Sequence, residues 1–100
     1  MTKVNTYEGN SFVVSRTYVT STTLQAYDVK FRMMQNKDDY TALVTVTGTV
    51  TGQGVVFNIP PQTTMSKGVY YFEITGETTT QKVTLEQDRV IVRESIVYVS

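Results

Sequence analysis

The stretch Val69-Tyr70-Tyr71-Phe72-Glu73-Ile74-Thr75 decides the fold of this chain of 100 residues. Successive side chains of a β-strand point to opposite faces of the sheet. Tyr70, Phe72 and Ile74 therefore share one apolar face, while the residues between them form a more polar one. This alternation predicts a strand that is buried on one side and open to solvent on the other.

The same alternation recurs along the chain and predicts an all-β domain of about seven to nine short strands. Thr and Val, both β-branched and suited to a pleated surface, account for 18 and 16 residues. Turn signals every 8–12 residues are typical of a β-sandwich or a small barrel. The expected core is Phe12, Val14, Val29, Phe31, Met33, Val44, Val46, Val55, Phe57, Ile59, Tyr70, Phe72, Ile74, Val83, Leu85, Val90 and Val92.

Three local features refine this prediction. Residues 40–50 are expected to form one strand, with Gly48 marking a bulge. Gln87-Asp88 is expected to be a turn that separates two strands. Arg16 interrupts an apolar face, which indicates that the strand around it lies at an edge or bends. We expect a single domain over residues 1–100, with residues 1–8 as an N-terminal arm.

The composition argues against enzymatic activity. The chain has no His and no Cys, so it lacks the side chains of a Ser-His-Asp triad, a thiol nucleophile or the usual zinc site. Its 9 basic and 9 acidic residues give a formal net charge of zero, which argues against nucleic acid or an anionic membrane as a partner. We therefore predict a non-enzymatic protein with no cofactor and no metal.

Two acidic clusters are candidate sites for a cation or for acid–base chemistry. Asp38-Asp39 with Asn36 does not have the spacing of a calcium-binding loop, so a turn is the better interpretation. Glu86 and Asp88 flank the expected turn at Gln87-Asp88, and we interpret them as solvated turn residues.

The chain has seven tyrosines, and their rings could fill an interface or stack on a sugar. Tyr71 lies on the same face as Glu73, opposite the expected core, so these two residues are candidates for contacts with a partner. The alternative is that an exposed strand tyrosine simply packs against its cross-strand neighbour.

The two ends of the chain supply the other interface candidates. Ile96-Val97-Tyr98-Val99 is apolar on both faces, so it is expected either to be central in the sheet or to be covered by another chain. The N-terminal segment 3–7, with Val4 and Tyr7, is expected to lie as an arm on a neighbouring subunit.

Much of the chain resembles a family of known domains. The progression Gly54–Pro60, Thr63-Thr64 and Lys67-Gly68-Val69-Tyr70 through Ile74 is similar to that of the immunoglobulin-like domain of tailed-bacteriophage virion proteins. That domain occurs at the N-terminus of upper baseplate proteins and in similar small tail and virion proteins. The further matches are the closing segment Thr84–Val92, Glu8-Gly9-Asn10-Ser11-Phe12 at the start of an early strand, and Val29-Lys30-Phe31-Arg32-Met33.

The resemblance implies an immunoglobulin-like antiparallel β-sandwich without an active site. It also implies a structural or docking role in the particle (tail, baseplate, neck or head), with other virion proteins as partners and a homo-oligomer or symmetric assembly as the working state. The expected location is the virion, after synthesis in the host cytoplasm. The alternative function is a carbohydrate- or receptor-binding module that uses exposed tyrosines.

Overall fold

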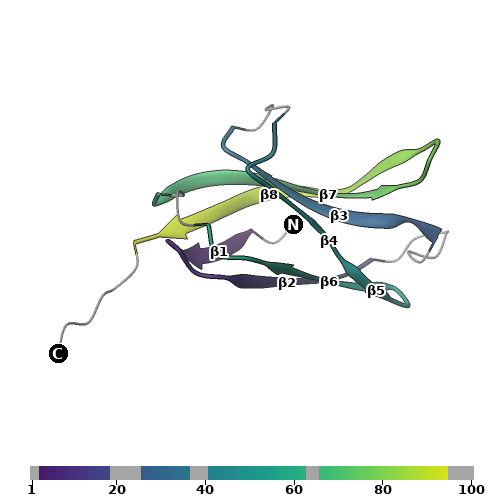
Figure 1. Cartoon of the computed structure of the whole chain (residues 1–100), viewed down its shortest axis with the longest axis horizontal. Helices are drawn as coiled ribbons and strands as arrows, with labels where there is room; N and C mark the ends of the chain where they lie inside the picture. The colour runs from purple at the N-terminus through teal and green to yellow at the C-terminus, as the bar shows by residue number, and fades with distance from the viewer. Residues whose placement is uncertain (1–2, 19–25, 37–40, 63–65, 95–100) are drawn as a thin grey trace.

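A computed structural model describes residues 3–18, 26–36, 41–62 and 66–94, and it confirms the all-β prediction. Eight strands form two sheets that pack face to face (Figure 1). Across the larger sheet the order is β1 (Val4–Tyr7), β8 (Lys82–Arg93), β7 (Gly68–Glu77), β3 (Asp28–Met34) and β4 (Val44–Thr47). Across the smaller sheet it is β2 (Phe12–Thr17), β6 (Gly54–Ile59) and β5 (Thr49–Thr51).

The strand order is that of an immunoglobulin-type sandwich. Such a sandwich places its second, fifth and fourth strands in one sheet and its third, sixth and seventh in the other. The order β2-β6-β5 and the order β8-β7-β3 reproduce this arrangement when β4 is counted as the extra strand beside the third. The first strand, however, joins β8 in the larger sheet instead of pairing with β2.

The position of β1 corrects the expectation of an N-terminal arm. Val4 to Tyr7 pair in parallel with Val90 to Arg93 of the same chain, so the sheet is mixed and not purely antiparallel. Val4 is 9% exposed and belongs to the hydrophobic core, which removes it as an interface candidate. The physical reason is that Val4 and Thr6 alternate with polar neighbours and so fit the inward positions of a strand.

Phenylalanine rings from both sheets form the centre of the core. Phe31 of β3 is fully buried, and its ring centroid lies 5.3 Å from that of Phe72 and 5.7 Å from that of Phe57. Phe12 of β2 approaches the same ring edge-on at 6.5 Å. Antibody domains hold this region together with a disulfide and a tryptophan, and this chain has neither residue type. The aromatic cluster therefore takes their place.

Most of the expected core residues are inside, with one clear exception. Val83 is 43% exposed. It faces the inward side, opposite Gly76, but it lies in the part of β7 and β8 near the tip of their hairpin, where no described residue covers it. Met34 is not among the expected core residues, yet it is only 6% exposed although it shares the outward parity of Arg32.

Gly48 is the point at which the chain crosses from one sheet to the other. The expected single strand over residues 40–50 is wrong, because β4 belongs to the larger sheet and β5 to the smaller one. A Cβ atom on Gly48 would lie 2.7 Å from Cε1 of Phe57 and would also collide with Val55. Glycine is needed here for close packing and not for a bulge.

Tyr70 makes the hydrogen bond that marks the corner before the sixth strand of immunoglobulin-like domains. Its hydroxyl donates to the carbonyl oxygen of Ser66, four residues upstream, at 2.9 Å. Tyr70 is half-buried against the core, so this bond fixes the loop that enters β7.

Replacing Tyr70 with phenylalanine is expected to lower the free energy of unfolding by about 1 kcal/mol, the usual net value of one hydrogen bond. Urea denaturation measures the change. Tyr71→Phe is the matched control because Tyr71 points to the opposite face, and it is expected to change stability by less than about 0.5 kcal/mol. Equal effects of the two substitutions would show that the corner bond does not stabilise the fold.

A buried ion pair also joins the two sheets. Nε of Arg16, on β2, donates to Oε1 of Glu86, on β8, at 3.0 Å, and the Tyr18 hydroxyl donates to the same oxygen at 2.6 Å. Glu86 is 6% exposed. Burial, together with the bond to Glu86, raises the pKa of Tyr18 well above its usual range, so this hydroxyl stays protonated and remains a donor.

Candidate functional site

The outer face of the larger sheet gathers the described side chains that are best placed for contacts with a partner. The register aligns Met34 of β3, Tyr71 of β7 and Arg89 of β8 in one row across the sheet. The next row holds Arg32, Glu73 and Gln87. Apart from Met34, which has the parity of Arg32 but is only 6% exposed, these residues alternate with buried ones along each strand, so their side chains point away from the core.

One half of this face is a network of charged and polar side chains, which we call the charged half. Nη2 of Arg32 donates to Oε2 of Glu77 at 2.7 Å, and its Nη1 donates to the Thr75 hydroxyl at 2.9 Å. Nη1 of Arg32 also lies 3.9 Å from Oε1 of Glu73, which in turn is 3.6 Å from Nζ of Lys82. These bonds hold the charged side chains in fixed positions.

Arg32 is the centre of the charged half. Its hydrogen bond to Glu77, followed by the bond from Thr75, lowers the pKa of the Glu77 carboxyl. Because the folded-state pKa is depressed, the contribution of this pair to stability is present above about pH 4.5 and is lost as the pH falls through the folded-state value. The Glu77 carboxyl is therefore ionised near neutral pH.

The other half of the outer face is apolar, and we call it the apolar half. It consists of Leu43, Met34, Tyr71, Val69 and Ile91. Met34 pairs with Tyr71 and Val69 pairs with Ile91, while Leu43 donates its backbone N–H to the carbonyl of the neighbouring Met33. Val69 is 49% exposed and Leu43 is 48% exposed. Solvent-exposed apolar side chains in adjacent positions are typical of a surface that another protein covers.

The structure brings some of the predicted interface residues together and separates others. Tyr71 and Glu73 lie side by side on the outer face, at the junction of its two halves. Tyr7 is 48% exposed and lies on the outward side of β1, opposite Arg93. Ile96, Val97, Tyr98 and Val99 lie outside the described residues, and the expectations for them stay predictions.

The sequence analysis missed Val69, Leu43, Met34 and Ile91. A signal for Val69 was available, because it has the same parity as Tyr71 in the strand that decides the fold. Leu43 and Met34 could not be found from parity alone, because their position beside Tyr71 depends on the register of β3 with β4 and β7.

Glu86 and Asp88 do not form a catalytic or metal site, whereas Asp38 and Asp39 lie outside the described residues and the turn expected there stays a prediction. Glu86 faces inward and binds Arg16, whereas a side-chain oxygen of Asp88 accepts a hydrogen bond from the backbone N–H of Arg89 at 2.8 Å. The expectation of a solvated turn at these residues is therefore wrong, because β8 passes through both without interruption. Among the described residues, no group of three or more acidic, His or Cys side chains could hold a metal ion.

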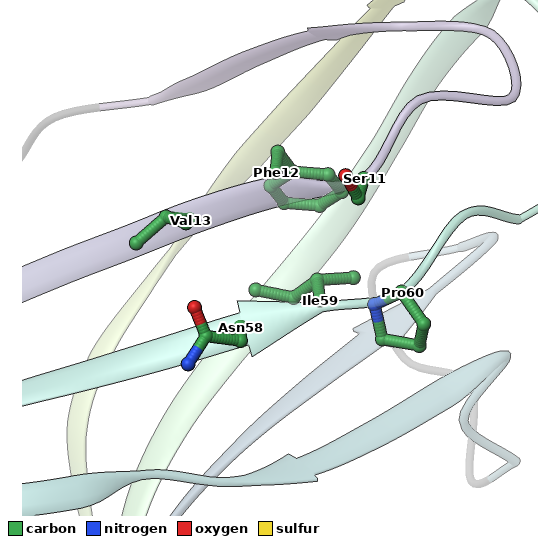
Figure 2. Close-up of a pocket in the computed structure, with 6 residues that line it drawn as sticks. All are labelled: Ser11, Phe12, Val13, Asn58, Ile59 and Pro60. Carbon is green, nitrogen blue, oxygen red and sulfur yellow. The ribbon is translucent and has the colours of Figure 1, made fainter.

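A surface pocket lies on the smaller sheet, away from the outer face of the larger one. Its volume is about 360 Å³, and its lining comes from the start of β2 and the end of β6. Figure 2 shows the six lining residues, which are Ser11, Phe12, Val13, Asn58, Ile59 and Pro60. The lining holds no titratable side chain, so it offers shape and apolar contact but no acid–base chemistry.

No protein-family model matches this chain, and no curated protein matches it. Within the described residues, no helix is long and apolar enough to cross a membrane.

Proposed function

We propose that this chain is a non-enzymatic docking domain of a tailed-bacteriophage particle and that it binds other virion proteins through the outer face of its larger sheet. The apolar half carries the proposal, because Val69 and Leu43 are each about half exposed there. Burying such side chains against a partner gains about 25 cal/mol per Å² of apolar surface.

The charged half adds specificity to this surface. Arg32, Glu73 and Glu77 are held in place by bonds to one another and to Thr75, so they are ordered before a partner arrives. A partner must present complementary charges in the matching positions, since like charges in contact cost several kcal/mol. An apolar patch beside fixed charges suits a defined protein partner better than a nonspecific surface.

The resemblance to immunoglobulin-like phage domains supplies the proposed setting. One of its motifs, Lys67-Gly68-Val69-Tyr70, contains both the corner tyrosine and Val69 of the apolar half. The same short motif thus fixes the loop that enters β7 and supplies an exposed side chain to the proposed docking face.

Val69→Lys is expected to reduce incorporation into particles by about tenfold or more, because it places a charge within the apolar half, at its most exposed side chain. Epitope-tagged chain is supplied during production of the particles that this chain belongs to, and the tag is quantified in gradient-purified particles. Val83→Lys is the matched control, because Val83 has a similar exposure of 43% but lies outside the outer face.

Two outcomes would contradict the proposal in different ways. Absence of the unsubstituted chain from purified particles would overturn the assignment to the virion. Equal incorporation of Val69→Lys and the unsubstituted chain would overturn the assignment of the docking face. Thermal unfolding of both variants shows whether they remain folded.

A further inference from the structure

Strand β2 is the longest edge strand of the described molecule. It pairs with β6 on one side, and no described strand lies on its other side. β2 has six residues, whereas the other edge strands, β1, β4 and β5, have four, four and three. A long edge strand presents a row of backbone N–H and C=O groups on which another strand can pair.

β2 also lacks the usual features that keep other strands away. Edge strands are commonly protected by lysine, by proline or by a bulge. β2 contains neither Lys nor Pro, and its register with β6 runs without a shift from Phe12 to Thr17. Its one charged residue, Arg16, binds Glu86 across the sandwich, and Nη1 of the same guanidinium donates to the carbonyl oxygen of Ser15 at 3.1 Å. On the opposite side of the strand Val13 is 63% exposed, the highest value among the exposed large apolar residues.

The pocket on the smaller sheet lies between β2 and its paired strand β6, at the end where β2 begins. Phe12 and Ile59 are register partners at the end where β2 begins, and Figure 2 shows Ser11 and Pro60 next to them. Its volume of about 360 Å³ is large enough for an apolar side chain. A strand added to the free side of β2 would meet backbone groups along its length, with the side chains of Phe12 and Val13 near the end where β2 begins.

Residues 95–100, Ser-Ile-Val-Tyr-Val-Ser, have the chemistry of such an added strand. They are uncharged and rich in β-branched and aromatic residues, which favour strands. Six residues extend over about 20 Å at roughly 3.3 Å per residue, which equals the length of β2. A strand at this edge would have one face near Phe12 and the other beside Val13, so it needs apolar residues on both faces. Ile96 to Val99 provide them.

The direction of β8 favours a second copy of the chain as the source of the added strand. β8 ends at Arg93, whose carbonyl oxygen accepts a hydrogen bond from the backbone N–H of Glu8, shortly before β2 begins. β8 runs toward that end of the molecule and β2 runs away from it (Figure 1). A chain that continues from β8 thus moves away from its own β2, and pairing within the chain would need a reversal at 94–95.

We propose that β2 of one copy accepts residues 95–100 of a second copy as an added strand. Such a contact is head-to-tail, so repetition closes into a ring or extends as a filament. It uses a different surface from the outer face of the larger sheet and does not depend on the proposed virion function.

Cysteine cross-linking of two separately labelled copies tests the proposal, because the chain has no natural Cys. One full-length copy carries Val97→Cys, and the other carries Val13→Cys, Ser15→Cys or Thr17→Cys, which scan the outward side of β2. Adjacent strands bring opposite residues within the distance that a disulfide requires. After mild oxidation we expect at least one acceptor position to form the mixed disulfide several-fold more than the control acceptor Val83→Cys.

Two results would overturn the proposal. In the first, none of the acceptor positions exceeds the control. In the second, chains that carry both Val13→Cys and Val97→Cys cross-link only within one chain, which would place the segment on its own β2.

Light scattering across a concentration series gives an independent readout without cysteines. The unsubstituted chain is expected to exceed its monomer mass of 11.3 kDa as concentration rises. Val13→Lys is expected to return it to the monomer, because Val13 is exposed and lysine protects an edge. Val83→Lys is expected to leave association unchanged. A monomer at every concentration, or an equal loss of association in both variants, would contradict the added strand.

Discussion

Replacing Phe31 with alanine is expected to lower the free energy of unfolding by about 3–5 kcal/mol. Phe31 is fully buried on β3, near the centre of the larger sheet, and its ring contacts Phe72 and Phe57. Its removal would leave a cavity between the two sheets, and because β3 pairs with both β4 and β7, the backbone has little freedom to close it. Domains of this size have a total stability of about 5–15 kcal/mol.

The expected loss is large because the core has no covalent support. The chain lacks the disulfide and the tryptophan that strengthen antibody domains, so apolar packing has to supply the connection between the sheets. Urea denaturation of the unsubstituted chain and of Phe31→Ala measures the loss of unfolding free energy, with the same dependence on urea concentration used for the two proteins. Phe31→Leu should recover most of the loss, because replacing one large apolar side chain with another of nearly the same volume usually costs less than about 1.5 kcal/mol. A loss below about 1.5 kcal/mol for Phe31→Ala would show that Phe31 is not central to the core.

This core was predictable from sequence because burial follows parity within each strand. Phe31, Phe57 and Phe72 each lie in a short run in which apolar and polar residues alternate, and all three are fully buried or nearly so. Tyr71 and Glu73 were assigned to the opposite face by the same rule, and the structure places them there. Parity needs no knowledge of the partner strands.

The errors arose where a local signal had two physical explanations. Val83 and Leu85 have one parity, while Val90 and Val92 have the other, and a turn was predicted between them at Gln87-Asp88. In the structure, the parity changes at a β-bulge within β8 instead of at a turn. Ile74 pairs with Glu86 and Thr75 pairs with Thr84, so Leu85 is left as an extra residue in a continuous strand.

Long-range pairing accounts for the other differences. The N-terminal segment is too short to predict as a core strand, and its parallel pairing with β8 joins residues about 86 positions apart in the chain. The apolar half of the outer face likewise depends on the register between three strands. Neither the position of an edge strand nor a cross-strand neighbour can be read from one segment alone, since both are properties of the assembled sheet.

The second large effect is expected at the ion pair between the sheets. Glu86→Ala would remove the acceptor of both Arg16 and Tyr18, whose donors lie 3.0 and 2.6 Å from Oε1 of Glu86. Removing one partner of a buried pair costs about 3–5 kcal/mol, because the other charge is left without compensation. The Arg16 side chain is 20% exposed and retains some contact with water, so we expect a loss of about 3 kcal/mol, at the lower end of this range.

The exposed pair of Lys67 and Glu94 supplies the matched control in the same protein. Its atoms lie 3.4 Å apart, but the two side chains are 66% and 72% exposed. Glu94→Ala is therefore expected to cost less than about 1 kcal/mol, as is usual for surface ion pairs. Urea denaturation at neutral pH compares the two substitutions. A similar small loss for Glu86→Ala and Glu94→Ala would show that the buried ion pair stabilises the fold no more than the exposed one.

A double-mutant cycle separates the ion pair from the cost of an uncompensated charge. Arg16→Met with Glu86→Leu replaces both charges by apolar side chains of similar length, and such replacements of buried pairs are often neutral or stabilising. The double variant is therefore expected to be more stable than Glu86→Leu alone, and comparison with both single variants, Arg16→Met and Glu86→Leu, is expected to give a coupling of about 1–3 kcal/mol between the two positions. If the losses instead add, the two side chains act independently. The link between the sheets would then rest on the phenylalanine cluster alone.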